Sequence, residues 1–148
     1  APNDELRDRL MPVNKKYPLA DLLEACREYA QKFSEKRPIF VEYTLLKGIN
    51  DNFDNAKELC SILRDLPCKI NLIPFNPFPG SVFKQPSSRR VREFQSILVE
   101  KGYSVTVRTT RGSDIQAACG QLVGRVSDRT NRQAKYGEIS LVNEKDFK

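Results

Sequence analysis

The alternation of helix-like and strand-like segments most constrains what this chain can fold into. Between residues 18 and 107, three segments with apolar residues at helical spacing each precede a short run rich in β-branched or aromatic residues. This order is typical of βαβ units, whose right-handed crossovers build parallel sheets and barrels. We therefore predict an α/β fold of three helix-strand units with parallel strands.

Turn and capping residues set the boundaries of these units. The predicted helices run from Pro18 to about Ser34, from Phe53 to Pro67, and from Ser87 or Ser88 to Gly102. The predicted strands cover residues 39–46, 69–74 and 103–107. The first of these strands is almost continuously apolar, which favours a strand buried on both faces.

Three units are too few for a complete barrel, which takes about eight, or about six in shorter relatives. The chain opens on Ala1 and a charged run that lacks the apolar centre of a signal peptide. We expect residues 1–124 to be the carboxy-terminal portion of a barrel domain, completed by an amino-terminal portion or by a partner. Residues 125–148 read as a basic polar tail, on the surface or partly disordered.

Charge and cysteine content narrow the classes of function. Lys and Arg number 25 against 19 Asp and Glu, and the resulting net charge of +6 favours phosphate-rich partners. The chain has no histidine, and its four cysteines show no C-x-x-C spacing, so we expect no metal site within it. Sparse cysteines favour a reducing cytoplasm. The apolar runs fall short of the roughly 20 residues of a membrane span.

Loops after parallel strands commonly carry the chemistry of such folds. Here they are residues 47–52, 74–80 and 109–122. Cys119 lies in the third, among small residues and near arginines that would lower the pKa of its thiol, so it is the candidate for a reactive cysteine. The alternative is a small buried hydrophobe, the interpretation that we favour for Cys26 and Cys60 on their helix faces.

Three ordered motifs add a specific resemblance: Pro-Val-Asn-Lys-Lys-Tyr at 12–17, Asn-Leu-Ile-Pro-Phe-Asn-Pro-Phe-Pro-Gly at 71–80, and Ala-Ala-Cys-Gly-Gln-Leu at 117–122. From residue 1 to about 124 the chain resembles the radical S-adenosylmethionine ribosomal RNA adenine methyltransferases. The fold implied is the carboxy-terminal part of a radical-SAM partial (β/α) barrel. The nearest branch methylates carbon 2 of an adenine in 23S rRNA and an adenine in tRNA.

The resemblance implies a mechanism centred on Cys119, which would take a methyl group from S-adenosyl-L-methionine. A second S-adenosyl-L-methionine, split at a [4Fe-4S] cluster reduced by an electron donor, would give the 5'-deoxyadenosyl radical that activates this methyl. The cluster motif, the family's acidic catalytic position and its resolving cysteine are absent from these 148 residues. We expect the missing amino-terminal part to bind the cluster, and this chain alone to be inactive.

The resemblance also assigns Asn76 to cofactor binding, although an Asn before Pro77 can instead simply form a turn. Arg108 and Arg111 could hold RNA phosphate or stack on a base, or could be solvated surface residues. Two further alternatives stay open. One is a relative that methylates adenine carbon 8, and the other is a noncatalytic RNA-binding module in which Cys119 is inert.

Overall fold

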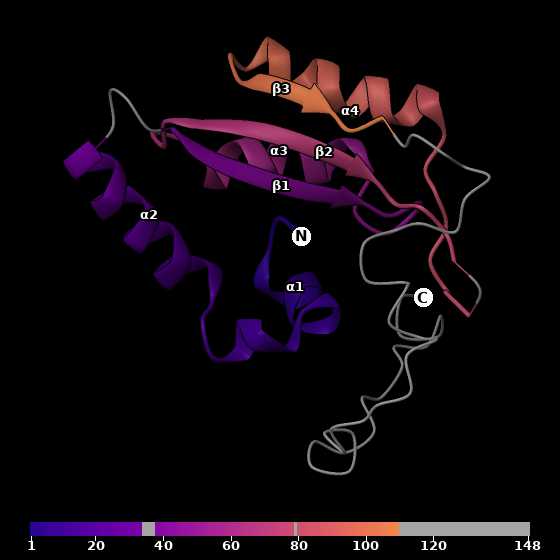
Figure 1. The fold of residues 1–148 in the computed structure, drawn as a ribbon, viewed down its shortest axis with the longest axis horizontal. Coiled ribbons are helices and arrows are strands. Elements are labelled where there is room, and N and C mark those ends of the chain that lie inside the picture. The colour runs from indigo at the N-terminus through magenta and orange to yellow at the C-terminus, as the bar shows by residue number, and fades with distance from the viewer. Residues whose placement is uncertain (34–37, 79, 110–148) are drawn as a thin grey trace, which may run out of the picture.

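A computed structural model describes residues 1–33, 38–78 and 80–109, so the predicted tail at 125–148 lies outside it. Its elements follow the predicted helix-strand order, with an additional helical segment before them (Figure 1). They are α1 (Asp4–Leu10), the 3-10 helix η1 (Pro12–Lys15), α2 (Leu19–Phe33), β1 (Ile39–Leu45), α3 (Phe53–Ile62), β2 (Cys68–Pro74), α4 (Ser88–Glu100) and β3 (Ser104–Val107).

The three strands form one parallel sheet in the order β1-β2-β3. Strand β1 pairs with β2 from Ile39 opposite Cys68 to Leu45 opposite Pro74. Strand β3 pairs with the middle of β2, where Leu72 lies opposite Val107. The predicted α/β class and the predicted parallel strands are both confirmed.

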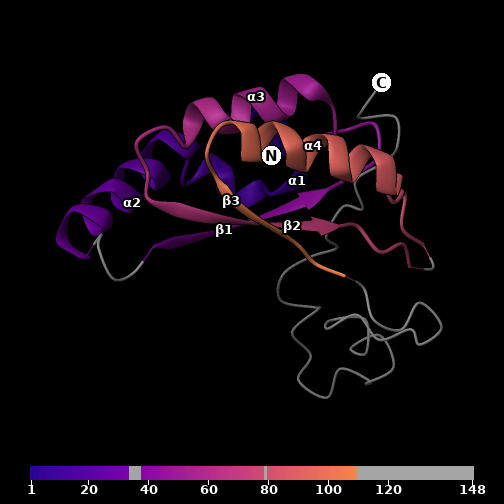
Figure 2. The ribbon, with the colours of Figure 1, turned by 90° about the horizontal axis from the view of Figure 1, so that it is seen from above.

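The layers of the fold are asymmetric. Helices α3 and α4 cover one side of the sheet, and none of the described helices lies on its other side (Figure 2). The core fills the space between helices and sheet, and its largest fully buried apolar side chains are Phe94, Leu45, Ile70, Leu72 and Leu98.

The prediction that residues 39–46 form a strand buried on both faces was wrong for the part of the chain described. Tyr43 and Leu45 are buried, whereas Phe40 is 71% exposed and Glu42 and Thr44 are exposed as well. Successive side chains of a strand point to opposite faces. Because α3 and α4 cover only one face, alternate residues of β1 remain accessible.

Helix α3 begins as predicted but ends earlier. The Asn52 side chain accepts a hydrogen bond from the Asn55 amide at 2.8 Å and caps its first turn. The helix ends at Ile62 rather than at Pro67, because the chain turns through Asp65, whose φ of 64° is incompatible with a right-handed helix. Leu63 and Leu66 are nonetheless buried, so the apolar pattern that suggested a longer helix reflects packing of the turn.

The sequence did not predict α1 and η1. Both are held by Asn14, which is 1% exposed. Its amide nitrogen donates to Asp4 Oδ1 at 2.8 Å and to Asp8 Oδ1 at 2.7 Å, while its oxygen accepts from Arg7. Asp4 Oδ1 also accepts from the amide of Leu19, so the same cluster fixes the start of α2.

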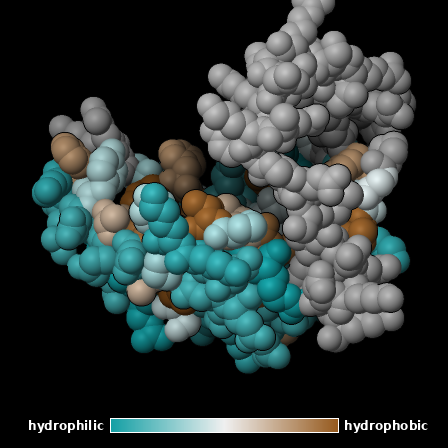
Figure 3. All heavy atoms as spheres, turned by 90° about the horizontal axis from the view of Figure 1, so that it is seen from below, coloured by the Kyte–Doolittle hydropathy of each residue, from teal (hydrophilic) through white to brown (hydrophobic). Residues whose placement is uncertain are grey.

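Helix α2 packs with only part of its apolar stripe. Ala30 is buried, and Leu23 and Cys26 are partly buried against the core. Larger apolar residues of α2 stay exposed, namely Leu22, Tyr29 and Phe33. Seen from below relative to Figure 1, the surface of the described residues is mainly hydrophilic, with apolar side chains among the polar ones (Figure 3).

Candidate functional site at the carboxyl ends of the strands

The carboxyl ends of the three strands meet at one edge of the sheet. The Phe75 amide donates to the Leu45 carbonyl at 3.0 Å, and the Arg108 amide donates to the Leu72 carbonyl at 2.8 Å. These bonds continue the strand pairing up to the points where the predicted functional loops start. Loops 47–52 and 74–80 thus begin side by side, and the third begins next to them and continues beyond the described residues.

The loop after β1 is fixed by the buried Asn50. Its side chain accepts from the Leu46 amide at 2.7 Å and donates to the Thr44 carbonyl at 2.8 Å, and its own carbonyl accepts from the Tyr43 hydroxyl at 2.9 Å. Burial, followed in effect by the charge of Glu58, raises the pKa of Tyr43, so this hydroxyl stays a donor. These three hydrogen bonds fix the conformation of the turn after β1.

The same loop uses two further local features. Asp51 Oδ1 accepts from the Gly48 amide at 2.8 Å, and Gly48 has a φ of 71° that favours glycine. Asn50 and Asp51 were not singled out from the sequence. Their signal was the run Gly48-Ile49-Asn50-Asp51, since Asn and Asp side chains commonly bond nearby backbone in turns.

Asn76, the predicted cofactor-binding residue, lies two positions after the end of β2 and is half-buried. Aromatic side chains surround its segment: the Phe75 ring centroid is 6.1 Å from that of Phe78 and 5.8 Å from that of Phe83. The Lys47 amide donates to the Lys84 carbonyl at 3.0 Å, so residues 80–84 fold back against the loop after β1. Asn76 therefore sits in a structured part of the edge.

Arg108 directly follows β3 and is exposed. Val105 and Val107 pack against the core, so the alternation of the strand directs Arg108 to the open side of the sheet, with Thr106. The other predicted site residues, Cys119 and Arg111, lie outside the described residues. Their roles as methyl carrier and RNA contact thus stay predictions.

A polar row crosses the open side of the sheet, and it was not foreseen from the sequence. In register, Glu42 of β1 lies opposite Asn71 of β2, which lies opposite Thr106 of β3. The Thr106 hydroxyl donates to Asn71 Oδ1 at 3.0 Å. Detecting the row from sequence needs the pairing register as well as the alternation, because the three residues lie in separate strands.

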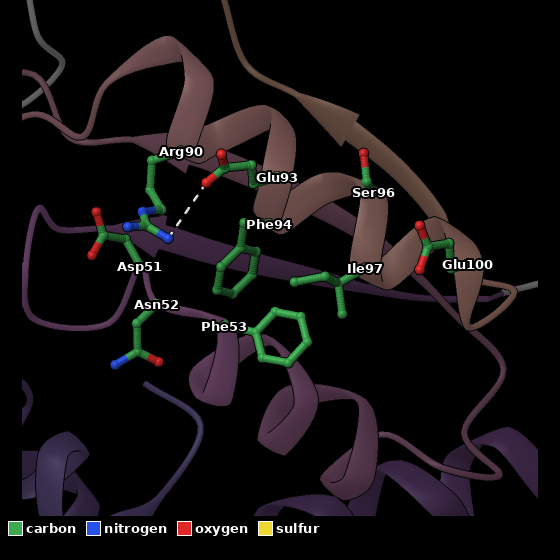
Figure 4. Close-up of a pocket in the computed structure, with 9 residues that line it drawn as sticks. All are labelled: Asp51, Asn52, Phe53, Arg90, Glu93, Phe94, Ser96, Ile97 and Glu100. Carbon is green, nitrogen blue, oxygen red and sulfur yellow. Dashed lines mark ion pairs between the residues drawn. The ribbon is translucent and has the colours of Figure 1, made fainter.

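A pocket of about 340 Å³ lies on the other side, between the start of α3 and the length of α4 (Figure 4). Phe53, Phe94 and Ile97 supply its apolar lining, and Arg90 pairs with Glu93 at 3.4 Å on its rim. It contains none of the site residues predicted from the sequence. The ion pair between Arg90 and Glu93 neutralises part of the charge at the pocket mouth, and we assign the pocket no function.

The described residues were also assessed for metal and membrane sites. Within residues 1–33, 38–78 and 80–109, no group of three or more Cys, Asp or Glu side chains is placed to hold a metal ion. The helices of the same part of the chain are all too short or too polar to cross a membrane.

Comparison with known proteins gives close relatives over nearly the whole chain, although no family model matches it. Proteins named "Dual-specificity RNA methyltransferase RlmN" from Marinomonas sp., Marinobacter nauticus and Pseudomonas fluorescens are 60%, 57% and 56% identical over 96%, 97% and 99% of this chain. The chain spans only 38%, 39% and 38% of their respective lengths.

Two solved structures resemble this chain in fold. A radical SAM methyltransferase from Sphaerobacter thermophilus superposes with a TM-score of 0.77 and 48% identity, over 82% of this chain and 35% of its own. A domain of pyruvate-formate lyase-activating enzyme from Bacteroides vulgatus superposes with a TM-score of 0.55 over 72% of this chain and 61% of its own. At 19% identity, this second match concerns the fold alone.

Proposed function

We propose that this chain forms the carboxy-terminal part of a radical S-adenosylmethionine RNA methyltransferase. The ground is that it belongs to the same family as the dual-specificity RNA methyltransferases named RlmN. The observation that carries the proposal is 56–60% identity across almost the entire chain. The fold agrees, because the three parallel helix-strand units superpose on a radical SAM methyltransferase. In this proposal residues 1–124 belong to the barrel domain and 125–148 form a basic tail.

The proposed substrate is RNA, and the finer assignment is carbon 2 of an adenine in 23S rRNA, with tRNA as a second substrate. Positive side chains at the carboxyl edge support a phosphate-rich partner. Lys47, Lys84 and Arg108 are all exposed there. Such contacts act through release of counterions from the RNA, so we expect binding to weaken as salt is added.

Cys119 is the residue that we propose to carry the methyl group. Its thiolate would attack the methyl carbon of S-adenosyl-L-methionine, forming an S–CH₃ bond as the carbon–sulfonium bond breaks and S-adenosylhomocysteine leaves. A [4Fe-4S] cluster, which we propose is held by a part of the full-length protein outside this chain and reduced by an electron donor, supplies the radical chemistry. We propose that Asn76 helps to hold the cofactor and that Arg108 and Arg111 contact RNA.

The test is peptide-level mass spectrometry of the full-length protein isolated from its source cells, combined with nucleoside analysis of RNA from the same cells. We expect one methyl group on Cys119 and 2-methyladenosine in RNA. Cys119→Ala should abolish the modified nucleoside, while the control Cys26→Ala, which alters a thiol packed against the core, should keep it. Finding 8-methyladenosine instead would favour the carbon-8 alternative. Unchanged RNA methylation in Cys119→Ala would refute the carrier role.

A further inference from the structure

The polar row Glu42-Asn71-Thr106 stands out because of where it lies. Both faces of a parallel sheet are ordinarily buried, and the interior of a barrel is ordinarily filled by branched apolar side chains. In this sheet the helix-covered side follows that rule, with Ile70 and Leu72 at 1% and 0% exposed. The opposite side places a carboxylate, an amide and a hydroxyl in one line across all three strands.

The hydrogen bonding within the row leaves specific groups available. The Thr106 hydroxyl lies 3.0 Å from Asn71 Oδ1 and 3.5 Å from the Ile70 carbonyl, so its one proton goes to the nearer amide oxygen, which leaves the Asn71 nitrogen as a donor. The exposed Glu42 forms no ion pair or side-chain hydrogen bond with any residue of the described ranges. A negatively charged acceptor and a neutral donor therefore lie on neighbouring strands.

The distance of Glu42 from the carboxyl edge favours a small ligand. Glu42 precedes the end of β1 at Leu45 by three residues, which is about 10 Å along a strand at about 3.3 Å per residue. Of the positive side chains suited to RNA phosphate, Lys47 and Lys84 lie at the edge itself, and Arg108 lies two residues beyond Thr106 on the side of β3 away from Glu42. S-adenosyl-L-methionine is small, carries a positive sulfonium and a positive ammonium, and has ribose hydroxyls, so it complements a carboxylate beside an amide donor.

We infer that Glu42 and Asn71 bind S-adenosyl-L-methionine, an assignment that rests on the proposed function. Glu42 supplies the negative charge and the acceptor for the cationic, hydroxyl-bearing cofactor, and Asn71 donates a hydrogen bond to one of its oxygens. Thr106 is a positioning residue that holds the Asn71 amide in the orientation in which its nitrogen faces the ligand. The cofactor site would thereby extend from Asn76 at the carboxyl edge onto the face of the sheet that the described helices leave open.

The experiment is equilibrium dialysis of labelled S-adenosyl-L-methionine against the full-length protein with its cluster loaded. Glu42→Gln keeps the shape of the side chain and removes its charge, so we expect the Kd to rise about tenfold or more. The matched control is Glu100→Gln, which neutralises an exposed carboxylate on α4, on the helix-covered side, and should leave the Kd unchanged.

A second pair of variants tests the positioning role. Thr106→Val removes the donor to Asn71 at nearly constant volume and should raise the Kd roughly threefold, whereas Thr106→Ser should restore it. If Thr106 had a purely structural role, Thr106→Val and Thr106→Ser would not differ in their Kd for S-adenosyl-L-methionine in this way. Thermal unfolding of each variant checks that the fold is kept, as expected for exposed positions.

Binding of an RNA oligonucleotide to the same samples separates the outcomes. An S-adenosyl-L-methionine Kd for Glu42→Gln within twofold of the parent overturns the inference, and so does a loss confined to RNA binding, which would assign the row to RNA. If the parent binds S-adenosyl-L-methionine through Glu42 but methylates no RNA, the proposed function fails and the inference stands. A parent protein that binds no S-adenosyl-L-methionine refutes both.

Discussion

Asn14 shows how one side chain can organise a segment that lacks an apolar core of its own. Its amide satisfies two aspartates and an arginine at once, and it is almost fully buried. Buried polar groups are costly when unpaired, so a saturated cluster of this kind selects one arrangement of the chain. The segment Pro12–Tyr17, which carried part of the family resemblance, thus serves in this structure to join α1 to α2.

The Asp4 carboxylate makes this cluster sensitive to pH. The hydrogen bond from the Leu19 amide, and then that from Asn14, hold the pKa of Asp4 below its usual value. A lowered folded-state pKa stabilises the protein above the unfolded pKa of about 3.9, and this stabilisation is lost as the pH falls through the lowered value. Asp4→Asn should therefore melt below the parent near pH 6, and the gap in Tm should narrow in more acidic buffer.

Thermal unfolding across that range is the measurement, with Glu5→Gln as the control at the next position of the same helix. A gap between Asp4→Asn and the parent that stays constant from neutral to acidic pH would show that the Asp4 charge contributes nothing through these hydrogen bonds. The control distinguishes the specific contact from a general loss of negative charge at the start of α1.

The start of α4 permits a sharp test at the scale of one element. The Ser87 side chain accepts from the Arg90 amide at 3.2 Å and caps the helix, whereas Ser88 is its first helical residue. Ser87→Ala should lower the free energy of unfolding by about 1 kcal/mol, and Ser88→Ala should change it by less than about 0.5 kcal/mol. Urea unfolding of both variants measures the difference. Equal losses would rule out Ser87 as the cap.

The predictability of the elements followed the strength of their local signals. Helices α2 and α4 were placed within a residue or two, because an apolar stripe and terminal Pro, Ser and Gly residues all agree. Helix α1 was missed because it has no buried residue and depends on Asn14, which lies outside it. Its local signal was Asn3 as N-cap followed by Asp4 and Glu5.

At the scale of the whole molecule, the central position of β2 should dominate local stability. Strand β2 is paired on both sides, whereas β1 and β3 are each paired on one side within the described sheet. Amide hydrogen exchange of this chain should therefore be slowest in residues 70–72, which are also buried or partly buried between neighbouring strands, and faster in β1. Exchange in β1 as slow as in β2 would mean that the outer edge of β1 is paired as well.

The candidate site was only partly predictable for a related reason. The common edge followed from the parallel order, and it brought Asn76 and Arg108 to the expected ends of β2 and β3. The polar row did not follow, since the contact between Asn71 and Thr106 joins residues 35 positions apart. Lateral neighbours of this kind depend on register, which residue spacing along the chain does not reveal.

The parallel register has an evolutionary consequence. Glu42, Asn71 and Thr106 are fixed by backbone pairing inside strands, whereas Lys47 and Lys84 at the carboxyl edge occupy connecting loops. Loops accept substitutions and insertions far more readily than paired strands do. The two groups of residues can therefore diverge at different rates: the loop lysines can change while the residues of the polar row stay fixed by strand pairing.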